Sequence, residues 1–215
     1  MMRYFKKLVV ALLTIGSCVG YADHLYDRTG GAKPIIAVLP VIDSTEGTKL
    51  SWDVSKEITE RIRERMVASN RLYLWKEGGN LEIAKELNVA NPTKLSKSVC
   101  DQLGDTEFVL VTELIEHQEK TFGIADKPSL EEVGADLGVR VRARVIDVRG
   151  NAPCIVLQEI ISYDDKVNRA YLSCDYEKAC FGTEAFERTP IGMAHSKITR
   201  ELVARVEGYI GARRG

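Results

Sequence analysis

The stretch Pro34-Ile-Ile-Ala-Val-Leu-Pro-Val-Ile42 decides how the fold is built. It is a nearly continuous apolar run, and such runs are typical of strands that are buried on both faces of a sheet. Pro40 has no N–H to donate to a neighbouring strand, so it indicates a bulge, an edge or the end of the strand. The segment therefore predicts a core strand over 35–39.

Amphipathic helices accompany this strand. Apolar residues recur every three or four positions over 53–68 and again over 191–210, where Pro190 stands near the start. Shorter helices are expected at 81–87 and 93–103, the second of which ends at a glycine. We expect the two long helices to pack on one face of the sheet, with four residues buried by their spacing: Ile58, Ile62, Ile198 and Leu202.

The other strands follow from apolar runs and alternation. Glu107-Phe-Val-Leu-Val-Thr-Glu-Leu-Ile115 predicts a second buried strand, whereas the polar segment 117–136 is expected to be irregular. The valines from Val139 to Val145 alternate with arginines, which predicts a half-buried strand with one basic face. The expected fold is α/β (α+β), with helices packed on a central mixed sheet of about five strands, namely 35–39, 71–75, 108–115, 139–148 and 154–162.

The amino terminus has the pattern of a secretory signal. Arg3, Lys6 and Lys7 precede a short apolar run, which ends in small residues. Its last residues, Ile15-Gly16-Ser17-Cys18, resemble the bacterial lipoprotein signal, which is cut just before the cysteine. The resemblance implies a signal peptide over 1–17 and a lipid on Cys18. The lack of periodicity up to residue 33 predicts a lipidated tether over 18–33, and the remaining length suits a single α/β domain over 34–215.

An ordinary secretory signal is the alternative, because Gly20-Tyr21-Ala22 also fits a cleavage site of the small-x-small type. A membrane-spanning anchor is disfavoured, since the apolar run is far shorter than the ~20 residues that a spanning helix needs. In the lipoprotein family the cysteine sulfur carries a diacylglycerol and its amine is usually acylated, for example by palmitate. More than one acyl chain gives stable anchoring, so Cys18 is expected to hold the domain on a membrane.

Val19, rather than an aspartate, follows that cysteine. In lipoproteins of bacteria with two membranes this implies transfer to the outer membrane, with the domain facing the periplasm. Exposure at the cell surface is left open.

The part of the chain after residue 17 contains 27 basic residues, because three of the 30 lie in the signal peptide. It also contains 31 acidic residues, so its net charge is −4 (27 − 31). It has no clustered basic face of the kind that nucleic acids require, so no nucleic-acid partner is expected.

Four cysteines remain once Cys18 is assigned to lipid, and they allow three pairings. Cys174 and Cys180 lie in a segment without periodicity, where a short disulfide loop is one interpretation. The other is that all four are buried, reduced thiols, which suits Cys100 and Cys154 better. The spacing of Cys174 and Cys180, with no histidine nearby, is a poor match to zinc sites, so no metal or other cofactor is expected.

The order of elements resembles a superfamily of periplasmic lipoproteins. Its members include the penicillin-binding-protein activator LpoB, the curli secretion lipoprotein CsgG and the amino-terminal domain of TolB. The resemblance covers most of residues 34–163 and implies their fold. It is carried by four segments: Ile35-Ile-Ala-Val-Leu-Pro40, Ile58-Thr-Glu-Arg-Ile-Arg-Glu-Arg-Met66, Asn70-Arg-Leu-Tyr-Leu-Trp75 and Leu103-Gly-Asp-Thr-Glu-Phe-Val-Leu-Val111.

The chain departs from that pattern at Val111-Thr112, where the superfamily has a glycine, and it lacks the long amphipathic insertions that a pore subunit needs. The segment Pro190-Ile-Gly-Met-Ala-His195 looks like an uncharacterised lipoprotein family of chlamydiae. Within the superfamily the functions differ, and a shared fold does not select one of them.

Candidate catalytic residues are sparse. The histidines are His24, in the tether, and His117 and His195, for which surface or helix-packing roles are expected. Neither a nucleophile elbow nor a phosphate loop is present in the sequence. We therefore expect a protein that is not an enzyme.

The arginine ladder is the most distinctive surface feature, with three members: Arg140, Arg142 and Arg144. It is either an exposed face with acidic cross-strand neighbours, Glu159 among them, or a docking strip for an acidic partner or glycan.

The expected function is an adaptor or activator that binds another envelope protein, such as a cell-wall synthase. The alternatives are an oligomeric subunit of a secretion or envelope-assembly complex, and a hydrolase with an unrecognised site.

Overall fold

The computed structural model describes residues 25–27, 30–45, 50–75, 81–89, 99, 102–122, 134–150, 153–168, 170 and 174–213. The predicted signal peptide and the predicted lipidation site, Cys18, lie outside these residues, as do His24 and Cys100. No helix among the described residues is long and apolar enough to cross a membrane.

A mixed six-stranded sheet forms the centre of the domain, with the strand order β3-β1-β4-β5-β6 and β2 paired to β4. The strands β1, β2 and β3 run parallel to their neighbours, whereas β4, β5 and β6 form an antiparallel meander. This confirms the predicted α/β class. The strands are β1 (Ile35–Val38), β2 (Ile42–Asp43), β3 (Tyr73–Leu74), β4 (Phe108–Phe122), β5 (Gly134–Asp147) and β6 (Cys154–Asn168).

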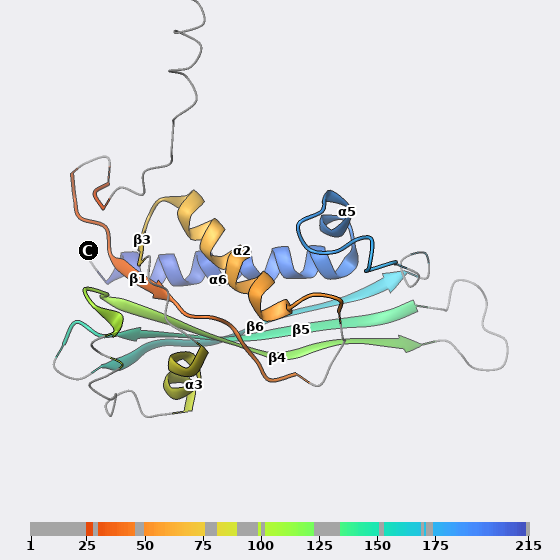
Figure 1. The fold of residues 1–215 in the computed structure, drawn as a ribbon, viewed down its shortest axis with the longest axis horizontal. Helices are drawn as coiled ribbons and strands as arrows, with labels where there is room; N and C mark the ends of the chain where they lie inside the picture. Colours follow the sequence, from red (N-terminus) through yellow and green to blue (C-terminus); the bar gives the residue numbers. More distant parts are fainter. Residues whose placement is uncertain are drawn as a thin grey trace, which may run out of the picture.

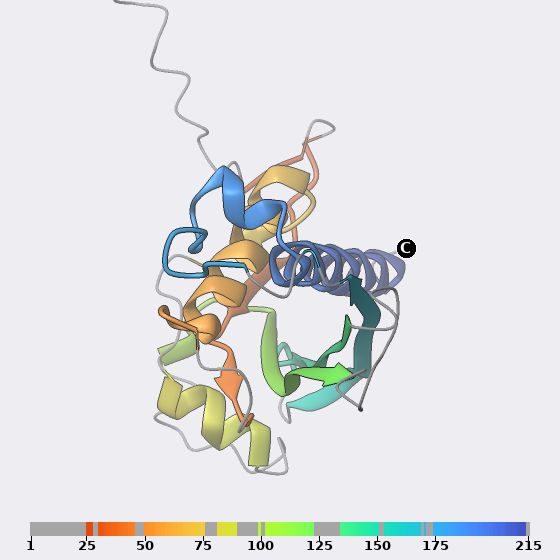
Figure 2. The ribbon, with the colours of Figure 1, turned by 90° about the vertical axis from the view of Figure 1, so that its right-hand side faces the viewer.

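Helices cover the two faces of the sheet unequally. The long helices α2 (Val54–Ser69) and α6 (Pro190–Ala212) lie on one side, here called the inner face, together with α5 (Glu184–Glu187) (Figure 1). On the other side, the outer face, α3 (Leu81–Val89) covers only the end of the sheet near β1 (Figure 1). Seen along its axis, α6 lies against β5 and β6, with α2 beside it (Figure 2).

Each face has its own apolar core. The inner core contains the four helix residues predicted from spacing, and their exposed fractions are all 2% or less: Ile58, Ile62, Ile198 and Leu202. The outer core is smaller and joins α3 to β1 and β4 through Leu39, Leu87 and Val109. The prediction that both long helices pack on one face is therefore confirmed.

The meander is longer than expected, and the prediction of irregular structure is wrong at 117–122 and 134–136, whereas 123–133 lie outside the described residues. β4 continues to Phe122 and β5 begins at Gly134. The added residues that face outward, Gln118, Lys120 and Asp136, are polar because no described helix lies over this part of the outer face. The register between β4 and β5 shifts between Leu114 and Glu116, which makes Ile115 the extra residue of a β-bulge.

The last part of the predicted tether is packed on the domain. Tyr26 and Ala32 form an antiparallel bridge around a turn in which the Asp27 carboxylate accepts a hydrogen bond from the Gly31 N–H. Lys33 is buried, with 2% of its surface exposed, and its ammonium donates to the Asn70 side chain at 2.5 Å. Folded structure therefore starts before residue 34.

Candidate functional site

The outer face of the meander is an open lattice of charged side chains. Beyond the end covered by α3, no described helix lies over it (Figure 1). Neighbouring strands contribute rows of side chains in which acidic and basic residues stand opposite each other in three of the four rows. Going away from α3, the rows are Glu113–Arg142–Ile160, Glu116–Arg140–Ser162, Gln118–Gly138–Asp164 and Lys120–Asp136–Lys166.

The arginine ladder lies on this face and is paired within it. Arg142 donates to Glu113 at 2.8 Å, and Arg140 pairs with Glu116 while its second nitrogen lies 3.5 Å from Asp164. The third arginine, Arg144, contacts Gln158 and Asn88. The guanidinium groups are therefore held in position by their neighbours, and part of each stays exposed.

The expected contribution of Glu159 to this strip is wrong. Glu159 stands opposite Ala143, which faces the inner side of the sheet, and its carboxylate pairs with Arg205 of α6. The acids that neutralise the ladder come mainly from β4. Strand β4 is the neighbour of β5 on the other side, and its residues Glu113 and Glu116 are in register with the arginines.

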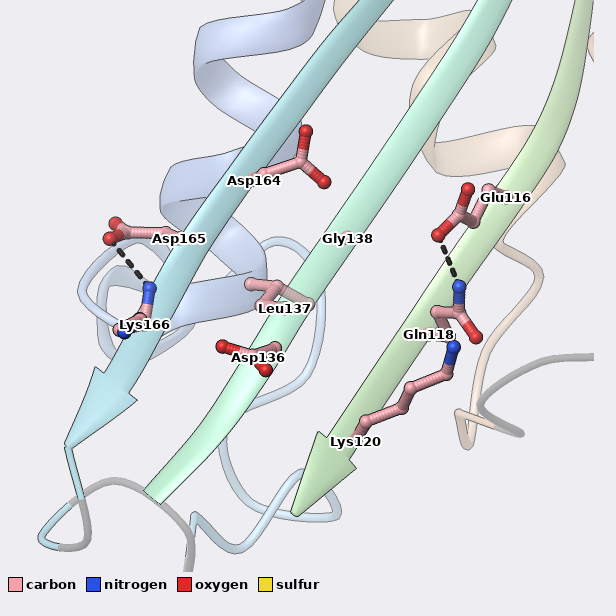
Figure 3. A pocket seen from close by; sticks show the side chains of 9 residues that line it. All are labelled: Glu116, Gln118, Lys120, Asp136, Leu137, Gly138, Asp164, Asp165 and Lys166. Carbon is pink, nitrogen blue, oxygen red and sulfur yellow. Dashed lines mark hydrogen bonds between the residues drawn. The ribbon is translucent and has the colours of Figure 1, made fainter. Parts of the chain in front are cut away.

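A hollow of about 490 Å³ lies at the far end of the open face. Gly138 forms its floor, and an added side chain there would meet the Glu116 carboxylate at 2.9 Å and the Asp164 carboxylate at 3.4 Å. Figure 3 shows Gln118 beside Glu116, and Lys120, Asp136 and Lys166 farther along the strands. The walls carry both signs of charge, and three of the carboxylates, Glu116, Asp164 and Asp165, already have partners, so the hollow does not select a ligand by charge.

The inner face holds a buried polar network that the sequence did not reveal. His117 of β4 and His195 of α6 lie with their Nε2 atoms 2.9 Å apart, and the exposed fractions of the two residues are 2% and 0%. The Nδ1 atom of His195 lies 2.9 Å from the Glu57 carboxylate of α2, which is fully buried. Glu57 also accepts hydrogen bonds from Trp52 and from Arg61, each at 2.8 Å.

The network continues to the surface through Arg61. This guanidinium donates two hydrogen bonds to Glu187, at 3.1 and 2.5 Å, and lies over the rings of Phe181 and Phe186. Arg61 therefore joins a buried carboxylate to the partly exposed Glu187 of α5. The network ties β4, α2, α5 and α6 together.

Geometry limits the protons that this network holds. Glu57 is an acceptor, so the Nδ1 atom of His195 carries a hydrogen. Between the two Nε2 atoms one nitrogen must donate and the other must accept, so the contact holds one proton. A second proton would place two N–H groups against each other in a site without solvent.

The pKa values follow this arrangement. Burial, and then the charge of His195, lower the pKa of His117 from 6.5 to about 4. Burial alone would raise the pKa of Glu57, but the hydrogen bond and charge of His195, with hydrogen bonds from Trp52 and Arg61, bring it below its ordinary value. Glu57 also lies in the first turn of α2, where the helix dipole favours a negative charge. The network is an ionic contact between elements, and its carboxylate Glu57 and both histidines are buried.

The predicted disulfide is not formed in the structure. Cys174 and Cys180 are both free thiols, and so is Cys154. Among the described residues, no group of three or more histidines, cysteines and acidic residues is arranged to hold a metal ion.

Comparison with known proteins places the chain in a family. The model of a family of unknown function, DUF7499, matches residues 22–214. The solved structure of the hypothetical protein CT253 from Chlamydia trachomatis superimposes with a TM-score of 0.69 and 32% identity, covering 84% of this chain and 99% of that one. No curated protein matches the sequence.

Two lipoprotein-related or oligomeric structures are more distant. Lipoprotein GNA1162 from Neisseria meningitidis has a TM-score of 0.39 at 15% identity, over 62% of this chain and 83% of that one. The PelC dodecamer from Paraburkholderia phytofirmans has a TM-score of 0.43 at 13% identity, over 81% and 88% of the two chains. The family model matches nearly the whole described domain, and CT253 is similar to this chain in both sequence and fold. This chain therefore belongs to the DUF7499 family.

Proposed function

We propose that this chain is an envelope lipoprotein, anchored to the outer membrane through Cys18, that binds another envelope protein and is not an enzyme. The observation that carries the binding role is the open outer face of β4–β6. It presents ordered charged side chains over a rigid three-stranded support, and no described helix covers it. Rigid elements position recognition groups better than loops do.

The histidines support a role without catalysis. A general base must come within hydrogen-bonding reach of its substrate, whereas His117 and His195 are buried and engaged with each other. The lipid anchor rests on the signal-like segment that ends at Cys18. Mass spectrometry of the mature amino terminus is expected to find an acylated cysteine, and a free terminus at Asp23 would instead establish cleavage after Ala22.

Site-specific photocrosslinking in cells that make the full chain tests the binding role. A photoreactive residue at Asp136 or Gln158, both exposed on the outer face, is expected to capture the same envelope protein. The control position is Val67, which is exposed on α2 and should capture nothing in common with them. Absence of a captured protein, or equal capture from all three positions, would contradict the proposal.

Oligomeric state separates an adaptor from a ring subunit. Light scattering of a chain that starts at Gly20 is expected to give a species that does not form a ring. A stable ring would favour a subunit of a secretion or assembly complex.

A further inference from the structure

One edge of the sheet has no neighbouring strand among the described residues. β6 pairs with β5 along its length, and the described backbone hydrogen bonds outside regular ladders and helices involve none of its residues. In an edge strand, alternate N–H and C=O groups point away from the sheet. Alternate residues of β6, a strand of 15 residues, therefore present backbone groups to this edge over roughly 50 Å, at about 3.3 Å per residue, and the Lys166 N–H donates to the Asp165 side chain.

This edge carries few of the features that block strand pairing. Natural edges are protected by prolines, lysines, bulges or short length. In β6 the register with β5 is regular from Leu157 onward, after a bulge at Val156, and the strand contains no proline and a single lysine, Lys166. Two apolar side chains stay exposed on it, Ile155 at 39% and Ile160 at 53%.

The side chains along the edge define what a neighbouring strand must carry. Ile160 and Asp164 are four residues apart, so both point to the outer face. The Asp164 side chain is 63% exposed, and Arg140, the residue with which it forms an ion pair, lies 3.5 Å away. Directly opposed side chains on neighbouring strands contact each other. A strand that fits here places an apolar residue opposite Ile160 and a basic residue opposite Asp164.

Charge favours a different protein over a second copy of this chain. β6 contains three acidic residues, Glu159, Asp164 and Asp165, and one basic residue, giving a net charge of −2 (1 − 3). Two copies paired edge to edge would place two strands of net charge −2 beside each other, and like charges on neighbouring strands are destabilising.

We propose that the β6 edge binds an extended segment of a partner protein, which joins the sheet as an additional strand with an apolar side chain opposite Ile160 and a basic side chain opposite Asp164. Backbone hydrogen bonds supply affinity in this mode of binding, and alternate side chains supply specificity. This inference rests on the proposed function and states how the envelope partner is held.

A displayed library of randomised ten-residue peptides, panned against the chain from Gly20, tests the inference. Enriched peptides are expected to share an apolar residue and a basic residue spaced four apart. Methylation of alternate backbone nitrogens should abolish their binding. Ile160→Lys and Asp164→Lys should each weaken binding at least about tenfold. The matched control, Met193→Lys, alters an apolar residue of α6 that is 43% exposed, and binding should be unchanged.

The inference is overturned if no peptide is enriched or if the enriched peptides lack this spacing. It is also overturned if peptide binding withstands N-methylation or the Ile160→Lys substitution. A dimer that Ile160→Lys dissociates would overturn it in favour of a second copy. Crosslinking in cells separates this result from the proposed function. Capture by the native chain that is lost in the Ile160→Lys chain supports the edge. A partner that the Ile160→Lys chain still captures removes the edge and leaves the adaptor role, whereas a native chain that captures no partner removes the role itself.

Discussion

The two faces of the β4–β6 meander both carry acid–base pairs, but the surroundings of those pairs differ. Beneath α6, the fully buried Glu57 carboxylate accepts from three donors. On the outer face, 20% of the Glu116 side chain and 42% of the Arg140 side chain stay exposed. A buried charge that loses its partner is costly, whereas an exposed pair contributes little to stability. Similar residues therefore stabilise the fold on one side and stay available for binding on the other.

The largest expected effect comes from removing the buried acid. Glu57→Ala leaves the buried His195 and the Trp52 N–H without their acceptor and removes one of the two carboxylates that pair with Arg61. We expect the free energy of unfolding to fall by about 3–5 kcal/mol, measured by urea denaturation. The matched control is Glu201→Ala, which removes an exposed acid that pairs with Arg205 on α6. That variant should lose no more than about 1 kcal/mol, and equal losses would contradict the distinction between buried and exposed acid–base pairs.

Acid tests the same network without mutation. The unfolded chain protonates His117 below about 6.5, whereas folding lowers the pKa of His117 to about 4. The unfolded state therefore binds more protons between these values, and stability falls as the pH falls from about 6.5 to about 4. His195 and Glu57 lie in the same network, and the charge of Asp43 also affects the pKa of His117. The loss should amount to about 3 kcal/mol from His117 alone.

His117→Gln isolates that contribution, because glutamine still offers a hydrogen-bond partner to His195 and does not titrate. Urea midpoints measured from pH 7 to pH 4 should show a smaller loss in this variant than in the native chain. Identical slopes in the two proteins would show that His117 titrates normally in the folded state.

The two ends of α6 offer a sharper contrast within one helix. At its buried end, a Cβ on Gly192 would lie 2.0 Å from the Phe186 carbonyl oxygen, so Gly192→Ala forces α5 and α6 apart. We expect a loss of about 1–3 kcal/mol. At the other end, Gly208 has open space around the same position, and Gly208→Ala should raise stability by about 0.5–1 kcal/mol, since alanine favours helices. Thermal melting of both variants checks the signs, and a stabilised Gly192→Ala would refute the close packing.

Periodicity alone predicted the inner layer, because the burial of Ile58 and Leu202 follows from helical spacing and does not depend on distant residues. The histidine pair could not be predicted in this way. Strict alternation from Glu113 would direct His117 to the outer face, but the bulge at Ile115 reverses the order and turns it toward α6. A bulge is set by tertiary packing, and the sequence of β4 carries no clear signal for it. The docking of Lys33 likewise depends on a distant residue, Asn70.

The smallest expected effect concerns the outer pair of Arg140 and Glu116. A double-mutant cycle with Arg140→Ala and Glu116→Ala measures their coupling while removing effects that each residue has alone. Both side chains reach solvent, so we expect a coupling below about 1 kcal/mol that weakens further in 1 M salt. A coupling of several kcal/mol would mean that this face, like the inner one, is needed to hold the sheet together. A small one, measured in variants that still fold, would leave these charges free to serve a binding partner.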